Sequence, residues 1–137
     1  MAKSFRDLEV WNLSVDLTML IYAITSDFPK HEIYGLSSQM RRSAISISSN
    51  LAEGSARGTK RDFRQFVLIA RGSNCELQTQ LMIAGRLGYL QAQKLNEAEA
   101  LCQRISRMLS GLSNFLKPKP TAPEPPRTDN PEPRTLP

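Results

Sequence analysis

Residues 59–88 read TKRDFRQFVLIARGSNCELQTQLMIAGRLG, and this stretch decides the fold class. Its apolar residues recur at spacings of three, four and seven, which places them along one face of an α-helix. That face consists of Phe63, Phe66, Val67, Ala70, Leu77, Leu81 and Ala84. Thr59 is a good N-cap residue, and Gly88 is a natural end. The predicted helix is roughly 40 Å long at about 1.5 Å per residue.

Three further amphipathic helices are predicted, at about Asp7–Ser26, Gly35–Ala52 and Ala92–Leu116. Pro29 ends the first of them, because the residue before a proline avoids the α region. Gly54 is expected to stop the second. Short connections favour antiparallel neighbours, and no alternation of period two persists. The sequence therefore predicts an all-α, up-down-up-down four-helix bundle.

A change in composition at residue 117 divides the chain into two parts. Eight of the nine prolines follow Lys117. A segment with so few apolar side chains cannot offset its own ordering entropy. We therefore expect a bundle over residues 1–116 and a disordered proline-rich tail over residues 117–137.

Composition limits the class of protein. A 137-residue chain with 40% apolar residues suits one domain. The chain has neither a signal-peptide pattern nor a long apolar run, so we expect no membrane partner and a cytoplasmic location. Cys75 and Cys102 are too few for a metal site and are expected to be reduced.

Catalytic chemistry is poorly represented in the sequence. The only histidine, His31, falls in a predicted loop. The segment 54–60, GSARGTK, resembles a phosphate-binding loop, but its glycine spacing and the order of threonine and lysine do not fit. We therefore predict a non-enzymatic protein with no catalytic residue, no metal and no cofactor.

Positive charge is concentrated around the second and third predicted helices. Between residues 41 and 71, seven basic residues face two acidic ones, within a chain of net charge +5. We call one set of these the basic ridge: Arg57, Lys60, Arg61, Arg64 and Arg71. A phosphate backbone suits such a surface, because each neutralised phosphate releases counterions. The alternative is a solvated helix face that only confers solubility.

The sequence leaves the extent of the basic ridge open and indicates how the ridge could bind a nucleic acid. Arg41 and Arg42 either extend the ridge or pair with Glu53 or Glu76. The ridge is expected to lie away from Phe63 and Phe66, on a face with no interleaved aromatic residue. Stacking on bases is therefore not indicated, and binding would rest on the backbone or shape of the nucleic acid.

Polar residues within the apolar stretches are the other notable feature. Asn50 and Glu53 lie near the end of the second predicted helix, and Glu76 lies within the third. If Glu76 is buried, it needs a partner such as Arg41 or Arg42, because an unpaired buried charge is costly. We interpret these three residues as structural groups that fix helix register or an oligomer interface.

An ordered set of short motifs spans about residues 5–116: FRDLEVW (5–11), IY (21–22), FP (28–29), YGL (34–36), SQMRRSA (38–44), SISSNLAEG (46–54), GS (72–73), ELQTQL (76–81) and GYL (88–90). Together these motifs resemble the four-helix-bundle proteins encoded in intervening sequences of bacterial 23S rRNA genes. One departure is Ser48, where that family often has proline.

The resemblance implies a fold, an assembly and a set of partners. It implies the same antiparallel bundle, assembled as a ring of five, and it extends to accessory proteins of diversity-generating retroelements. Those are basic pentamers that work with a reverse transcriptase and its RNA. We therefore expect a homopentameric protein that binds structured RNA or DNA through the basic ridge. The alternative is a protein-interaction scaffold, for example an accessory subunit of a reverse transcriptase, with the basic face incidental.

Overall fold

The computed structural model describes residues 4–119, and within that range the chain is helical with no strand. Two short 3-10 turns, η1 and η2, precede α1 and α2 respectively. The elements are η1 Phe5–Asp7, α1 Glu9–Thr25, η2 Lys30–Glu32, α2 Leu36–Ser55, α3 Lys60–Arg86 and α4 Ala92–Phe115. The tail predicted to be disordered lies outside the described residues from position 120 onward.

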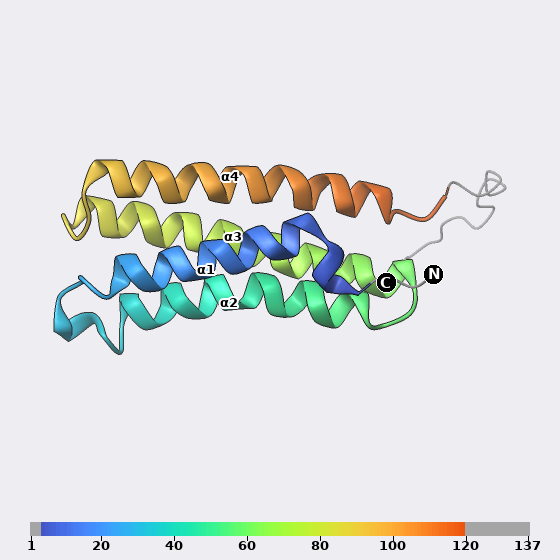
Figure 1. Cartoon of the computed structure of the whole chain (residues 1–137), viewed down its shortest axis with the longest axis horizontal. Coiled ribbons are helices and arrows are strands. Elements are labelled where there is room, and N and C mark those ends of the chain that lie inside the picture. The colour runs from blue at the N-terminus through green and yellow to red at the C-terminus, as the bar shows by residue number, and fades with distance from the viewer. Residues whose placement is uncertain (1–3, 120–137) are drawn as a thin grey trace, which may run out of the picture.

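The four long helices lie side by side in one antiparallel bundle (Figure 1). Each helix packs against two others, in the cyclic order α1, α2, α3, α4 and back to α1. The connections α1–α2 and α3–α4 lie at one end of the bundle, and the connection α2–α3 lies at the other end (Figure 1). This arrangement confirms the predicted four-helix bundle.

The core is formed by the apolar stripes that the sequence predicts for α2, α3 and α4. Val67, Ala70, Leu77 and Leu81 of α3 are fully buried. They pack with stripes from the two neighbouring helices: Met40, Ala44, Ile47 and Leu51 of α2, and Cys102, Ile105 and Leu109 of α4. Burying these stripes against one another is the main driving force for the fold.

The core face of α1 carries both apolar and polar side chains. Leu17, Ile21 and Ile24 form the core face, whereas Tyr22 is 40% exposed. Two polar residues of α1, Ser14 and Thr25, are also buried. The Thr25 hydroxyl donates a hydrogen bond to the Ile21 carbonyl oxygen at 2.7 Å. Such a local bond lets a hydroxyl enter the core without an unpaired donor.

Gly54 does not stop α2, contrary to the prediction. The helix continues to Ser55, and Gly54 is buried inside it. A Cβ atom at this position would lie 2.6 Å from the Phe66 Cβ of α3. The glycine therefore allows α2 and α3 to approach closely where they leave the connecting turn. Gly58, with φ of 93°, is the residue that takes the left-handed conformation in that turn.

Within residues 4–119, no helix combines the length and the apolar character needed to cross a lipid bilayer.

Candidate nucleic-acid interface

Arg57, the first residue of the basic ridge, folds back onto α2. Its Nη2 donates to Glu53 Oε2 at 2.7 Å, and its guanidinium lies 4.9 Å from the centre of the Phe66 ring. The prediction that the ridge faces away from the α3 aromatic residues is therefore wrong for Arg57. Because both partners of this ion pair are about half exposed, it contributes little to stability.

Arg64 joins α3 to the last turn of α4. Its Nε donates to the backbone carbonyl oxygen of Ser113 at 2.9 Å. Carbonyl groups in the last turn of a helix lack intrahelical partners, and a positive charge is favourable there. Arg64 is therefore partly committed to holding the bundle together, and only part of its surface is exposed.

Lys60 and Arg61 are exposed, as Arg57 is, and Arg71 is half-buried two turns beyond Arg64. Among residues 4–119, the ion pairs involve other basic side chains, so none of Lys60, Arg61 and Arg71 is paired. The structure thus leaves the accessible charge of the ridge at the N-terminal end of α3.

Phe115 lies beside Lys60, and the sequence interpretation missed this neighbour. The Lys60 ammonium is 5.0 Å from the centre of the Phe115 ring. Phe115 is the last residue of α4 and is 69% exposed. The expectation of a basic face without aromatic residues is therefore wrong. The predicted antiparallel arrangement could have indicated this contact, because it brings the last turn of α4 to the start of α3.

Two more lysines follow Phe115 at the same end of the bundle. Lys117 and Lys119 are exposed, and the Lys117 amide donates to the Asn114 carbonyl, which keeps it close to the end of α4. We call the surface formed at this end of the bundle the basic end: Lys60, Arg61, Arg64, Phe115, Lys117 and Lys119. In residues 57–64 and 113–119, Asp62 is the single carboxylate side chain.

Arg41 and Arg42 do not extend the ridge in the way the sequence allowed. Arg41 donates from Nε to Thr25 Oγ1 at 2.8 Å, and its guanidinium lies 4.5 Å from the Tyr22 ring centre. It therefore ties α2 to α1. Arg42 is exposed and lines a groove on the opposite side of α2.

That groove lies between α2 and α3 and is polar. Ser46 and Ser73 share a hydrogen bond of 2.8 Å across it, and Asn50 donates to the Ser46 carbonyl at 2.7 Å. Its volume is about 390 Å³, and it is lined by Gln39, Arg42, Ser43, Ser46, Ser73, Glu76 and Gln80. Asn50 thus bonds within its own helix, and its role in fixing helix register or an oligomer interface stays a prediction.

Glu76 is exposed in the groove, so the condition under which it needs a partner is not met. Its Oε1 accepts a long hydrogen bond of 3.5 Å from Ser43 Oγ. The ion pairs of the described residues do not join it to Arg41 or Arg42, and Glu53 pairs with Arg57 instead. Within residues 4–119, no group of three or more His, Cys, Asp or Glu side chains is placed so that it could bind a metal ion.

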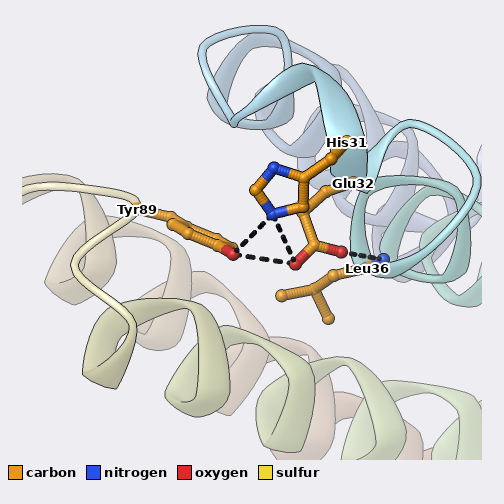
Figure 2. A network of polar contacts seen from close by, with 4 residues as sticks. All are labelled: His31, Glu32, Leu36 and Tyr89. Atoms are coloured by element: carbon orange, nitrogen blue, oxygen red, sulfur yellow. Dashed lines mark hydrogen bonds and ion pairs between the residues drawn. The ribbon is translucent and has the colours of Figure 1, made fainter.

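A second cluster, which the sequence did not indicate, joins the two connections at the other end of the bundle (Figure 2). Tyr89 Oη donates to Glu32 Oε2 at 2.8 Å, and the Leu36 amide donates to Glu32 Oε1 at 3.0 Å. His31 Nε2 lies 3.4 Å from the Tyr89 hydroxyl. These hydrogen bonds from Leu36 and Tyr89 lower the pKa of the Glu32 carboxyl, and the carboxylate raises the pKa of Tyr89.

Fold and surface together define a small all-α four-helix bundle with a basic end. The chain belongs to the 23S rRNA-intervening sequence protein family, whose model matches residues 6–111. This match confirms the resemblance to the rRNA-intervening-sequence family that the sequence motifs indicate.

A solved structure has the same fold. It is the crystal structure, at 1.70 Å resolution, of a protein with unknown function from the S23 ribosomal protein family of Bacteroides thetaiotaomicron VPI-5482. The two chains are 20% identical, the TM-score is 0.69, and the alignment covers 76% of this chain and 97% of that one. At this identity the likeness concerns the fold alone. No curated protein matches the sequence.

Proposed function

We propose that this protein is a non-enzymatic, self-associating protein that binds structured RNA or DNA through its basic end. The observation that carries the proposal is the meeting of two basic segments far apart in the sequence. Lys60 and Arg61 at the start of α3 lie at the same end of the bundle as Lys117 and Lys119 after α4. The solvated-face alternative predicts no such convergence.

The chemistry of the basic end suits phosphate groups. Exposed lysine and arginine side chains can each neutralise a phosphate and release its counterions. Such contacts carry no sequence information, so selectivity would rest on the shape of the nucleic acid. Affinity should fall steeply as the salt concentration rises.

Self-association is the second part of the proposal, and a homopentamer is the assembly that the family resemblance implies. Exposed isoleucines on α2 and α3 support contacts between copies: Ile45, Ile69 and Ile83 are 40%, 51% and 46% exposed. Multi-angle light scattering should give five times the 15.4 kDa chain mass. A mass of one chain at micromolar concentration would contradict this part.

The binding experiment is fluorescence anisotropy with a structured RNA and a duplex DNA, at low and at near-physiological salt. The test variant is Arg61→Glu, because Arg61 is exposed and has no ion pair within residues 4–119. Arg64 is unsuitable, since its reversal would also break the bond to Ser113. The matched control is Arg86→Glu, the same charge change on the same helix but at the other end of the bundle.

Salt-sensitive binding that Arg61→Glu weakens about tenfold, and that Arg86→Glu leaves nearly unchanged, would support the basic end as the interface. Equal losses in both variants would show that only net charge matters. No binding at low salt would reduce the basic end to a solubility feature and refute the proposed function.

A second candidate function is a protein-interaction scaffold, for example an accessory subunit of a reverse transcriptase. It is favoured by exposed apolar residues at the end opposite the basic end. Tyr34 is 94% exposed, Ile33 55% and Leu87 54%, on two connections that Glu32 and Tyr89 join. A neighbouring reverse-transcriptase gene with repeated RNA templates would favour this function. Binding to that enzyme should then be lost in Ile33→Ser/Tyr34→Ser and kept in Arg61→Glu.

A further inference from the structure

Phe115 has an environment that differs from that of an ordinary surface phenylalanine. It is the last residue of α4 and is 69% exposed. The Lys60 ammonium contacts its ring at 5.0 Å, and this cation comes from the first turn of α3. The contact leaves much of the ring open to solvent. An exposed aromatic ring at the end of α4 thus lies against a cation from α3, and the exposed Lys117 and Lys119 follow it in the chain.

An exposed aromatic ring with cations nearby is a surface on which a nucleobase can stack. Base–aromatic stacking is tolerant of sequence, because every base has a π-face, and the cations hold the adjoining phosphates. A paired base within a helix is already stacked on its neighbours, so only an unpaired base can use the ring. Beside Lys60, a surface hollow of about 230 Å³ between the α2–α3 connection and α3 offers a path for the strand.

We propose that Phe115 stacks on an unpaired base, so that the basic end prefers single-stranded segments of RNA or DNA to continuous duplex. Lys60 orders the ring by its cation–π contact. Arg61, Lys117 and Lys119 contact the phosphates on either side. This inference rests on the proposed function and adds the class of nucleic acid that the same surface selects.

The experiment compares three labelled probes of equal phosphate number by fluorescence anisotropy at low salt. They are a short uridine-rich single strand, a fully abasic strand and an RNA duplex. The variants are Phe115→Ala and Phe115→Trp. The matched control is Tyr34→Ala, which removes an aromatic residue that is 94% exposed at the opposite end of the bundle.

The wild-type protein should bind the uridine strand about tenfold more tightly than the abasic strand. Phe115→Ala should abolish that difference while its affinity for the abasic strand stays the same. Phe115→Trp should keep or increase the difference, and Tyr34→Ala should leave it unchanged. This pattern is specific to stacking, because loss of charge or of folding would weaken binding to every probe.

Four outcomes would overturn the inference. If Phe115→Ala keeps the wild-type preference, or if the wild-type protein binds both strands equally, the ring is not a stacking platform, although backbone binding would still stand. If no probe binds, the proposed function fails as well. If Phe115→Ala changes the mass measured by light scattering, the ring is a contact between copies of the chain.

Discussion

Arg64 and Ser113 are separated by 49 positions in the sequence, yet the Arg64 Nε donates to the Ser113 backbone oxygen at 2.9 Å. The bond closes the end of the bundle where α3 begins and α4 ends. A residue that the sequence groups with the nucleic-acid-binding candidates therefore has a structural role as well. Its neighbour Arg61 is exposed and makes no such contact within residues 4–119, so the two arginines can be separated by experiment.

Arg64→Met should destabilise the protein by about 1 kcal/mol, because a carbonyl oxygen in the last turn of α4 loses a charged donor at a partly exposed site. Methionine keeps most of the aliphatic length and the helix propensity. Arg61→Met should change the free energy of unfolding by less than about 0.5 kcal/mol. Urea denaturation followed by circular dichroism measures both. Equal destabilisation in the two variants would exclude the assigned role of Arg64.

Gly54→Ala should destabilise the bundle by about 1–3 kcal/mol, which is the usual cost of overpacking. The added methyl group would meet the Phe66 Cβ at 2.6 Å, so α2 and α3 must move apart or Phe66 must move away. Differential scanning calorimetry should show a lower melting temperature. The opposing effect, the better helix propensity of alanine, is smaller than the steric cost.

Gly72→Ala is the matched control for that prediction. Gly72 lies within α3 and is exposed, and a Cβ there would have no heavy atom within 4 Å. Alanine should therefore raise the free energy of unfolding by roughly 0.5–1 kcal/mol through its helix propensity alone. Destabilisation at Gly72 as large as that at Gly54 would mean that the close approach of α2 and α3 is not the cause.

The Glu32 cluster should make stability depend on pH in the acidic range. The Leu36 amide and the Tyr89 hydroxyl hold the pKa of Glu32 below its ordinary value of 4.5 in the folded state. The unfolded chain therefore binds this proton at a higher pH than the folded chain does. The stabilisation is complete above the unfolded pKa and is lost as the pH falls through the folded pKa.

Glu32→Gln provides the measurement of that dependence. The difference in melting temperature between the wild-type protein and Glu32→Gln should be constant above about pH 5 and should shrink steadily below it. Tyr89→Phe removes one of the two donors, so it should weaken the same pH dependence without abolishing it. A difference that does not change between about pH 6 and pH 3 would contradict the role of the carboxylate.

The sequence predicts the fold because its signal is local and repeated. Spacing alone predicts an apolar stripe on α2 that begins at the half-buried Leu36 and continues through buried residues: Met40, Ala44 (or Ser43), Ile47 and Leu51. The structural role of Gly54 was predicted incorrectly. A glycine that ends a helix and a glycine that allows close packing cannot be distinguished in the sequence without the neighbouring helix. The tertiary contact with Phe66 decides between the two roles.

The candidate site was predicted in part. The basic residues of α3 were found from charge, but the partners of Arg57, Arg64 and Lys60 were not, since Glu53, Ser113 and Phe115 are recognised only once three helices are placed. Phe115 shows the physical reason. Its spacing puts it beside an apolar stripe, but it is the last residue of α4, where the neighbouring helices no longer cover it.

The two cysteines should differ sharply in reactivity. Cys75 is exposed on α3, whereas Cys102 is fully buried in α4, where burial and then the nearby Glu99 carboxylate raise the pKa of its thiol to about 12. Because the thiolate is the nucleophile, iodoacetamide at mildly alkaline pH should modify Cys75 alone in the folded protein. Asn74→Ala should speed modification of Cys102, since it removes the 2.8 Å bond from Asn74 Nδ2 to the Cys102 carbonyl. Mass spectrometry of timed samples measures both rates. Equal rates for the two cysteines in the native protein would contradict the packing of α3 on α4, whereas equal rates only in denaturant would support it.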